Sequence, residues 1–272
     1  MVIAVRRCEF CDSPVPADAT VCPICREEIA EETLERILPM LKRPDAPDVR
    51  HMGVGERMWG VIRRPAATYR DIAQRPDQAG PFAIIIINAL IMMGIFFAIS
   101  SKFIVTVRVN STYTVDTSIL STQAAPIFYL TGFLSILPNI LIGMLYLLVG
   151  SAFAHLAFKI TGGIGSKNQT MSIVGYSMLP LILFRLLAVL IAFLIFPPQN
   201  AQHAADFAAI IQVIQASEIW TIIDYMTVAS FVWIGFLLIF GIRETHDTST
   251  MWAFMVSLAV MIVLNWTFWQ AH

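Results

Sequence analysis

Long apolar stretches dominate this chain from residue 81 to its C-terminus, and each is long enough to cross a bilayer as a helix. A helix needs about 20 mostly apolar residues to span the roughly 30 Å hydrocarbon core. Charged residues make up 14% of the chain, whereas soluble domains carry about 25%, so the polar surface of a water-soluble globule is missing. The sequence therefore predicts an all-α polytopic membrane protein with a bundle of five transmembrane helices.

Two of the predicted spans contain a proline. The second apolar region is too long for one simple crossing, and we expect Pro138 to kink it, while Pro180 lies inside the third. An external loop, residues 102–120, alternates β-branched and polar residues around Asn110-Ser111, which predicts a β-hairpin. The spans are expected at residues 81–100, within 125–158, at 170–196, 219–240 and 250–269, with a more polar helical stretch over 204–217.

Four cysteines near the N-terminus, the only ones in the chain, form the pairs C-E-F-C and C-P-I-C. Two such turns supply four thiolates, the ligand set of a structural zinc site. We therefore expect one structural zinc ion and a reducing compartment, in which free thiols persist. The alternatives are two disulfides in a secreted protein and a redox-active cysteine pair. The apolar stretch at the start of the chain is too short for a secretory signal, which disfavours the first. The expected ligands are Cys8, Cys11, Cys22 and Cys25.

The composition divides the chain into four parts. In residues 56–80, apolar and aromatic residues interleave with arginines, which is typical of a helix in the membrane interface. Pro65 is expected to open a second short helix there, and the alternative is a helix packed on the zinc module. The predicted parts are 1–38, a zinc ribbon with a short amphipathic helix at 27–38; 39–55, a linker; 56–80, the interfacial segment; and 81–272, the five-span domain.

The distribution of charge predicts the orientation in the membrane. Loops on the side of the N-terminus carry nine Lys and Arg residues, against two in loops on the opposite side. Positive residues are enriched in cytoplasmic loops, so we expect the N-terminus in the cytoplasm and the C-terminus outside or in a lumen. Residues 1–50 carry ten acidic and seven basic residues. This balance has the wrong sign for binding a phosphate backbone, so no nucleic-acid partner is expected.

Two ionisable residues lie within predicted spans, where an uncompensated charge is costly. Arg185 lies near the middle of the third span and Asp224 near the outer end of the fourth, and we predict that they pair. Such a pair is either structural or part of a proton or solute path. His155 is expected to be interfacial rather than a ligand. We also expect hydrogen bonds between helices from Asn88, Asn139 and Asn265, and close helix packing at Gly143, Gly150 and Ala154.

Three motifs in order resemble the Yip family, five-span membrane proteins named for interacting with Ypt/Rab GTPases. They are R-R-P-A-A-T-Y-R-D-I-A-Q-R-P at 63–76, Gly162-Gly163 leading to Gly175-Tyr176 and Pro180, and W-I-G-F-L-L-I-F-G-I-R-E-T-H at 233–246. The resemblance implies a cytoplasmic N-terminus, five helices and a role in membrane organisation or trafficking without known catalysis. The zinc module departs from the better-studied eukaryotic members, so a Rab partner is not carried over and a prokaryotic-type relative is implied.

The cysteine segment separately looks like the short zinc ribbons fused to many regulatory and membrane proteins. Asp12 and Arg26 stand where a glycine usually follows each knuckle. We therefore expect a non-enzymatic membrane scaffold whose zinc-stabilised head recruits a cytoplasmic protein. The alternative is a small transporter or channel that uses Arg185 and Asp224. Membrane lipids and an unidentified cytoplasmic protein are the expected partners, and a homo-oligomer is left open. The sequence contains neither an H-E-x-x-H nor a G-x-S-x-G motif, so no catalytic motif of these kinds points to an enzyme.

Overall fold

The computed structural model describes residues 5–8, 11, 13–16, 21–26, 38, 51–110, 113–161, 165–200 and 218–271. Contacts along the chain divide it into two compact units. Unit 1 comprises Met1–Pro81, Leu147–Ser177 and Ile234–His272, and unit 2 comprises Phe82–Tyr146 and Met178–Trp233. The predicted helix at 204–217 lies outside the described residues, and so does the predicted helix at 27–38 except for its last residue, Leu38.

Five helical segments in the described part of the chain are long and apolar enough to cross a membrane, as the sequence predicts. Their bounds differ from the expected ones by a few residues. The largest difference is at α10 (Glu218–His246), which continues six residues past the predicted end, while α11 (Thr250–Ala271) continues two. The five candidate spans are Ala79–Ser100, Ala125–Ile160, Lys167–Leu194, Trp220–His246 and Thr250–Gln270. The protein is therefore an all-α polytopic membrane protein.

Prolines interrupt the second and third candidate spans. The second consists of α5 (Ala125–Leu134) and α6 (Ile136–Thr161), and the third of α7 (Lys167–Ser177) and α8 (Leu179–Leu194). A proline cannot donate to the carbonyl four residues earlier, and its ring clashes with that carbonyl. For Pro138 that carbonyl belongs to Leu134, the last residue of α5, which explains why the helix is interrupted there, while the kink itself stays a prediction.

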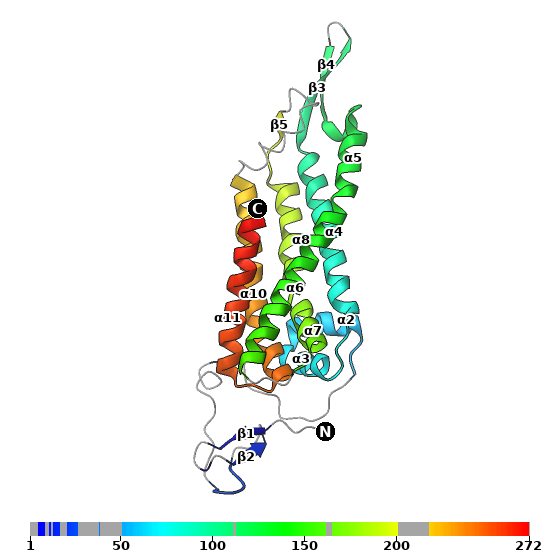
Figure 1. The fold of residues 1–272 in the computed structure, drawn as a ribbon. Coiled ribbons are helices and arrows are strands. Elements are labelled where there is room, and N and C mark those ends of the chain that lie inside the picture. The colour runs from blue at the N-terminus through cyan, green and yellow to red at the C-terminus, as the bar shows by residue number, and fades with distance from the viewer. Residues whose placement is uncertain are drawn as a thin grey trace. The chain divides into compact units, whose positions relative to one another are not determined.

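Unit 1 contains two short helices before the first span, α2 (Val54–Arg63) and α3 (Pro65–Gln74). The side chain of Glu56 accepts a hydrogen bond from Gly53 N at 3.2 Å, which closes the first turn of α2. Pro65 opens α3 as predicted, because its missing N–H is not needed in a first turn. The two helices contact each other and α7, and Figure 1 shows the three together.

Unit 2 contains the predicted β-hairpin. Strands β3 (Phe103–Asn110) and β4 (Tyr113–Ser118) pair antiparallel, and β5 (Gln199–Asn200) adds a short parallel strand that the sequence does not predict. The hairpin rises from the end of α4 (Ala79–Ser100), as Figure 1 shows, and the short helix η2 (Ile119–Ser121) follows it. Apolar residues beneath it form one core cluster: Ile95, Ala98, Ile99, Phe103, Ile119, Phe128, Ala188, Ala192, Phe196 and Ile223.

The glycines predicted to allow close packing do so. A Cβ on Gly143 would lie 2.9 Å from Ile85 Cγ2, and one on Gly150 would lie 3.2 Å from Val174 Cγ1. Both distances are shorter than ordinary van der Waals contact, so a larger residue would require the neighbouring side chain to move.

The predicted hydrogen bonds between helices from two asparagines are wrong. Asn139 Nδ2 donates to Ser135 O at 2.8 Å, and Asn265 Nδ2 donates to Met261 O at 2.9 Å. Each amide thus bonds to the carbonyl four residues back in its own segment, a common alternative for polar side chains in helices. Asn88 Oδ1 is buried and has no hydrogen-bond partner within the described part of the chain.

Candidate functional site

The four N-terminal cysteines converge on one point. Their Sγ atoms all lie within 4.8 Å of one another, with Cys8 Sγ 3.6 Å from Cys25 Sγ and Cys11 Sγ 3.7 Å from Cys22 Sγ. A tetrahedral zinc site with Zn–S bonds of about 2.3 Å has S–S edges of about 3.8 Å. All four cysteines have free thiols in the structure. The four cysteines can hold a metal ion.

A short β-ribbon and a tight turn bring these thiols together. Strands β1 (Val5–Arg7) and β2 (Pro14–Pro16) pair antiparallel, and Cys8 N donates to Ser13 O at 2.9 Å. The second knuckle closes when Arg26 N donates to Cys22 O at 2.9 Å. Arg26 has φ 60°, a left-handed conformation. This explains why glycine is usual at that position, since glycine adopts positive φ without steric cost.

The surroundings of the cysteines favour thiolates. Hydrogen bonding from Ser13 lowers the pKa of the Cys11 thiol to about 6. A backbone hydrogen bond from Cys25 lowers the pKa of the Cys22 thiol. Thiolates are the form that binds metal, so both shifts prepare these groups for coordination.

The described core of the head is built largely from its cysteines. Within its described residues the core consists of Cys8, Val15 and Cys22, with Cys25 packed against them. Three of these four residues are the expected metal ligands, so a metal bound by them would also tie together the described core of the head.

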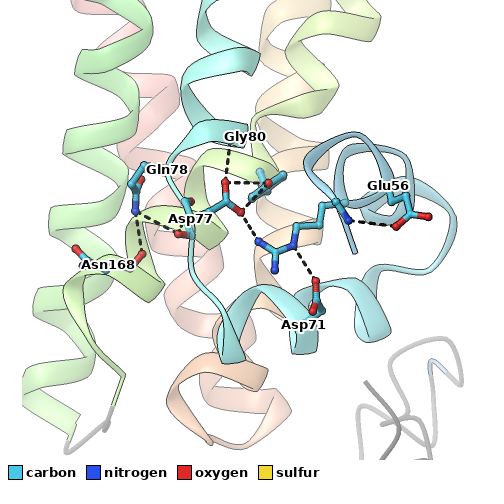
Figure 2. A network of polar contacts seen from close by, with 10 residues as sticks. Glu56, Asp71, Asp77, Gln78, Gly80 and Asn168 are labelled. Atoms are coloured by element: carbon cyan, nitrogen blue, oxygen red, sulfur yellow. Dashed lines mark hydrogen bonds and ion pairs between the residues drawn. The ribbon is translucent and has the colours of Figure 1, made fainter. Parts of the chain in front are cut away.

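A second polar cluster lies in unit 1 around Arg57 (Figure 2). Its Nε donates to Asp71 Oδ2 at 2.7 Å, and its Nη1 donates to Asp77 Oδ2. Asp77 also accepts from Tyr176 Oη at 2.9 Å and from Gly80 N at 3.0 Å. One carboxylate therefore joins α2, α7 and the first turn of α4. We call Arg57, Asp71, Asp77 and Tyr176 the Arg57 cluster.

Burial makes the Arg57 cluster energetically important. The side chain of Asp71 is fully buried and that of Arg57 is 7% exposed. Burial lowers the pKa of the Arg57 guanidinium, but hydrogen bonding and the charge of Asp71 raise it, and the net pKa lies above the ordinary value. Arg57 is therefore held as a cation between two carboxylates.

Further hydrogen bonds join α3 to α7. Tyr69 Oη donates to Ser177 Oγ at 2.5 Å, because the Ser177 hydroxyl itself donates to Ile173 O at 2.7 Å. Burial raises the pKa of Tyr69, so its hydroxyl stays protonated. At the other end of α3, Gln169 Nε2 donates to Ala73 O at 2.7 Å.

The segment between α3 and α4 bonds to α7 as well. Gln78 Nε2 donates to Asn168 O at 3.3 Å, as Figure 2 shows, and to Ser172 Oγ at 3.2 Å. Ser172 Oγ in turn donates to Asp77 O at 2.7 Å. Together with the contacts of α3, these bonds fix the residues before the first span to the start of the third.

Another group of ion pairs lies at the C-terminal end of α10, the end predicted to face the cytoplasm. Glu244 Oε2 lies 3.1 Å from Arg70 Nε, and its Oε1 lies 3.2 Å from Arg243 Nη2. The Arg243 side chain is fully buried and its Nη1 donates to Thr250 Oγ1 at 3.3 Å. Two of the arginines counted for membrane orientation thus bind within the protein.

Two histidines share one threonine hydroxyl in the same unit. Thr170 Oγ1 lies 3.4 Å from His155 Nδ1 and 3.1 Å from His246 Nε2. Phe158 stacks on His246 with ring centroids 3.9 Å apart. His155 is half-buried, and its bond to Thr170 is a role that the sequence does not predict.

Arg185 and Asp224 both lie in unit 2. Arg185 is in α8 and Asp224 in α10, and each residue is 9% exposed. Their burial agrees with a location inside the protein rather than in lipid. The ion pair between them stays a prediction.

Sequence reasoning missed the Arg57 cluster because Arg57 was counted with the interfacial arginines. The sequence of α3 does contain a pattern that could have revealed the cluster. Asp71 follows Thr68 by three residues, which places it on the face that also buries Ile72. An acid on a buried helical face needs a cationic partner, and an arginine lies 14 residues earlier.

Comparison with known families decides the affiliation of the chain. The model of the Yip1 domain matches residues 59–269. The chain belongs to the Yip1 domain family. No curated protein and no solved structure matches it.

The Yip1 match begins inside α2 and ends inside α11, so it contains Asp71, Asp77 and Tyr176 of the Arg57 cluster. The four cysteines lie before it. The five candidate spans and the Yip1 match both indicate a multi-pass integral membrane protein of a family related to membrane trafficking. The cysteine head is therefore an addition to the Yip1 domain.

Proposed function

We propose that this chain is a non-enzymatic membrane-organising scaffold that recruits a cytoplasmic protein through its metal-stabilised head. The observation that carries the proposal is the convergence of four thiols in a small head outside the Yip1 match. The second knuckle exposes apolar side chains, with Ile24 65% and Val21 47% exposed. Exposed apolar residues that lie together mark protein-binding sites.

Zinc is the metal that we propose, because four thiolates at tetrahedral spacing suit it. Cys8, Cys11, Cys22 and Cys25 would hold one structural ion and leave no open coordination position. Elemental analysis of the purified protein should return about one zinc per chain. Cys8→Ser combined with Cys22→Ser should remove it. A wild-type preparation that is metal-free and still has a folded head would contradict the zinc proposal.

Partner recruitment is tested by proximity labelling from the intact protein in its membrane. Ile24→Asp should abolish labelling of the partner while zinc content stays at the wild-type level. Tyr113→Asp, at an equally exposed site in the β-hairpin, is the matched control. Loss of labelling in both variants, or in neither, would contradict recruitment through the second knuckle.

A transporter or channel is the second candidate, and the burial of Arg185 and Asp224 in one unit supports it. Specific solute flux in liposomes that is lost in Arg185→Gln would favour this function. A double-mutant cycle tests the pair itself, because paired charges give a double variant less destabilised than the two single changes predict. Strict additivity would rule the pair out.

A further inference from the structure

The structure separates the arginines before the first span into two groups. Arg57 and Arg70 bind carboxylates of the protein, as described above. Arg63, Arg64 and Arg75 have exposed side chains, and no carboxylate of the described residues is within ion-pair distance of them. Within the part of the chain that the structure describes, these three guanidinium groups thus have no ion-pair partner.

An exposed tryptophan lies beside this group. Trp59 is 63% exposed, and the guanidinium carbon of Arg63 is 5.6 Å from its ring centroid. Two acids of the same segment, Asp71 and Asp77, bind Arg57 instead of these arginines. We call Trp59, Arg63 and Arg64 the cationic face.

The connections of α2 and α3 hold the cationic face close to the bilayer. From the end of α3 at Gln74 to the start of α4 at Ala79 the chain takes five steps, at most about 18 Å when extended. The bond from Gln169 to Ala73 joins α3 to α7, where the third candidate span begins. Helices tied to the starts of two spans lie at the membrane surface.

We propose that the cationic face binds the headgroups of anionic phospholipids. An arginine fork matches phosphate oxygens and can donate two hydrogen bonds to them. Tryptophan favours the headgroup level, where its ring is partly in the apolar layer and its N–H meets water. Charge complementarity thus favours an anionic lipid. Arg64 is the single residue between α2 and α3, so its guanidinium group follows directly after that of Arg63 in the chain.

The test measures which lipids the full-length protein retains. Wild-type protein is equilibrated in mixed micelles with equal amounts of phosphatidylglycerol and phosphatidylcholine, and bound lipids are counted by native mass spectrometry. Wild type should retain phosphatidylglycerol several-fold in excess, and Arg63→Gln with Arg64→Gln should abolish the excess. Arg108→Gln, an exposed arginine on β3, is the matched control and should retain it. Screening by 0.5 M salt, for which the Debye length is about 4–5 Å, should also reduce it.

An excess that persists in Arg63→Gln with Arg64→Gln, or that is equally lost in Arg108→Gln, would overturn the proposal. A second readout reports on Trp59 directly. In nanodiscs with brominated phosphatidylglycerol, fluorescence quenching should fall in Trp59→Phe, and unchanged quenching would also overturn it. The inference is independent of partner recruitment, because Cys8→Ser with Cys22→Ser should leave the lipid excess intact.

Discussion

At the scale of the residue, Arg57 is the side chain whose loss should do most damage. Removing one partner of a buried charge pair leaves the other charged and desolvated, which costs about 3–5 kcal/mol. Arg57→Gln should therefore lower the free energy of unfolding in detergent by about 3 kcal/mol, because it leaves fully buried Asp71 without its cation. Arg63→Gln, on the same helix but exposed, should change it by less than about 0.5 kcal/mol. Equal effects would contradict the assignment.

Tyr69 offers a finer measurement of a single hydrogen bond. Tyr69→Phe removes the hydroxyl that donates to Ser177 and should lower the free energy of unfolding by about 1 kcal/mol. Tyr113→Phe removes a hydroxyl from a residue that is 62% exposed and should have no measurable effect. Reversible unfolding in detergent, followed by circular dichroism, compares the two; a neutral Tyr69→Phe would count against the bond.

Arg26 carries backbone strain that glycine would relieve. A non-glycine residue in the left-handed region costs about 1 kcal/mol, and Arg26 has φ 60°. Arg26→Gly should therefore strengthen metal binding by about fivefold in competition with a chelator, provided that the knuckle forms only around the metal. Asp12→Gly, at the equivalent position of the first knuckle, tests whether both turns share this conformation. Weaker binding in Arg26→Gly would refute the strain.

At the scale of the element, we expect Gly→Ala to have opposite effects on thermal stability at two helical positions. Gly→Ala in a helix interior normally stabilises by up to about 1 kcal/mol. A Cβ on Gly94 in α4 would meet its nearest neighbour at 4.0 Å, so Gly94→Ala should raise the thermal midpoint in detergent. A Cβ on Gly175 in α7 would lie 2.4 Å from Pro81 Cβ, so Gly175→Ala should lower it. The same sign for both would disprove the close approach.

Elements were predictable from the sequence wherever local chemistry determines them. Pro65 and Pro138 set helix boundaries through a missing donor and a steric clash, both readable from position alone. The hydrogen-bond partners of side chains were not predictable in this way. Asn139, for example, donates to a carbonyl of its own segment instead of to another helix. Likewise, Arg57 and Arg63 look alike in the sequence, and only packing against α7 separates a buried cation from an exposed one.

At the scale of the whole molecule, the cysteine head serves as a natural reporter of orientation. All cysteines of the chain lie in the head, so a membrane-impermeant maleimide added to intact cells with a chelator should label nothing until the cells are permeabilised. Tyr113→Cys in a background of Cys→Ser at all four positions should be labelled without permeabilisation. The reverse pattern would invert the proposed topology.

The family and the candidate metal ligands were predictable because both rest on spacing along the chain. Four cysteines at knuckle spacing indicate one site, and the order of three motifs indicated the Yip family that the match over residues 59–269 confirms. The Arg57 cluster was not predictable in the same way. Its members Arg57, Asp77 and Tyr176 span more than a hundred residues, and only the fold brings them together.

The position of Asp77 has a consequence for how the protein meets bilayers of different thickness. Its carboxylate accepts from Gly80 at the start of α4 and from Arg57 in α2, so the depth of that helix end is fixed by the surface helices. The 22 residues of α4 extend about 33 Å, close to the roughly 30 Å of an average hydrocarbon core. In a thinner membrane the helix cannot slide, and must tilt about its anchored end. Hydrophobic mismatch would thus be absorbed at the opposite end, where the β-hairpin begins.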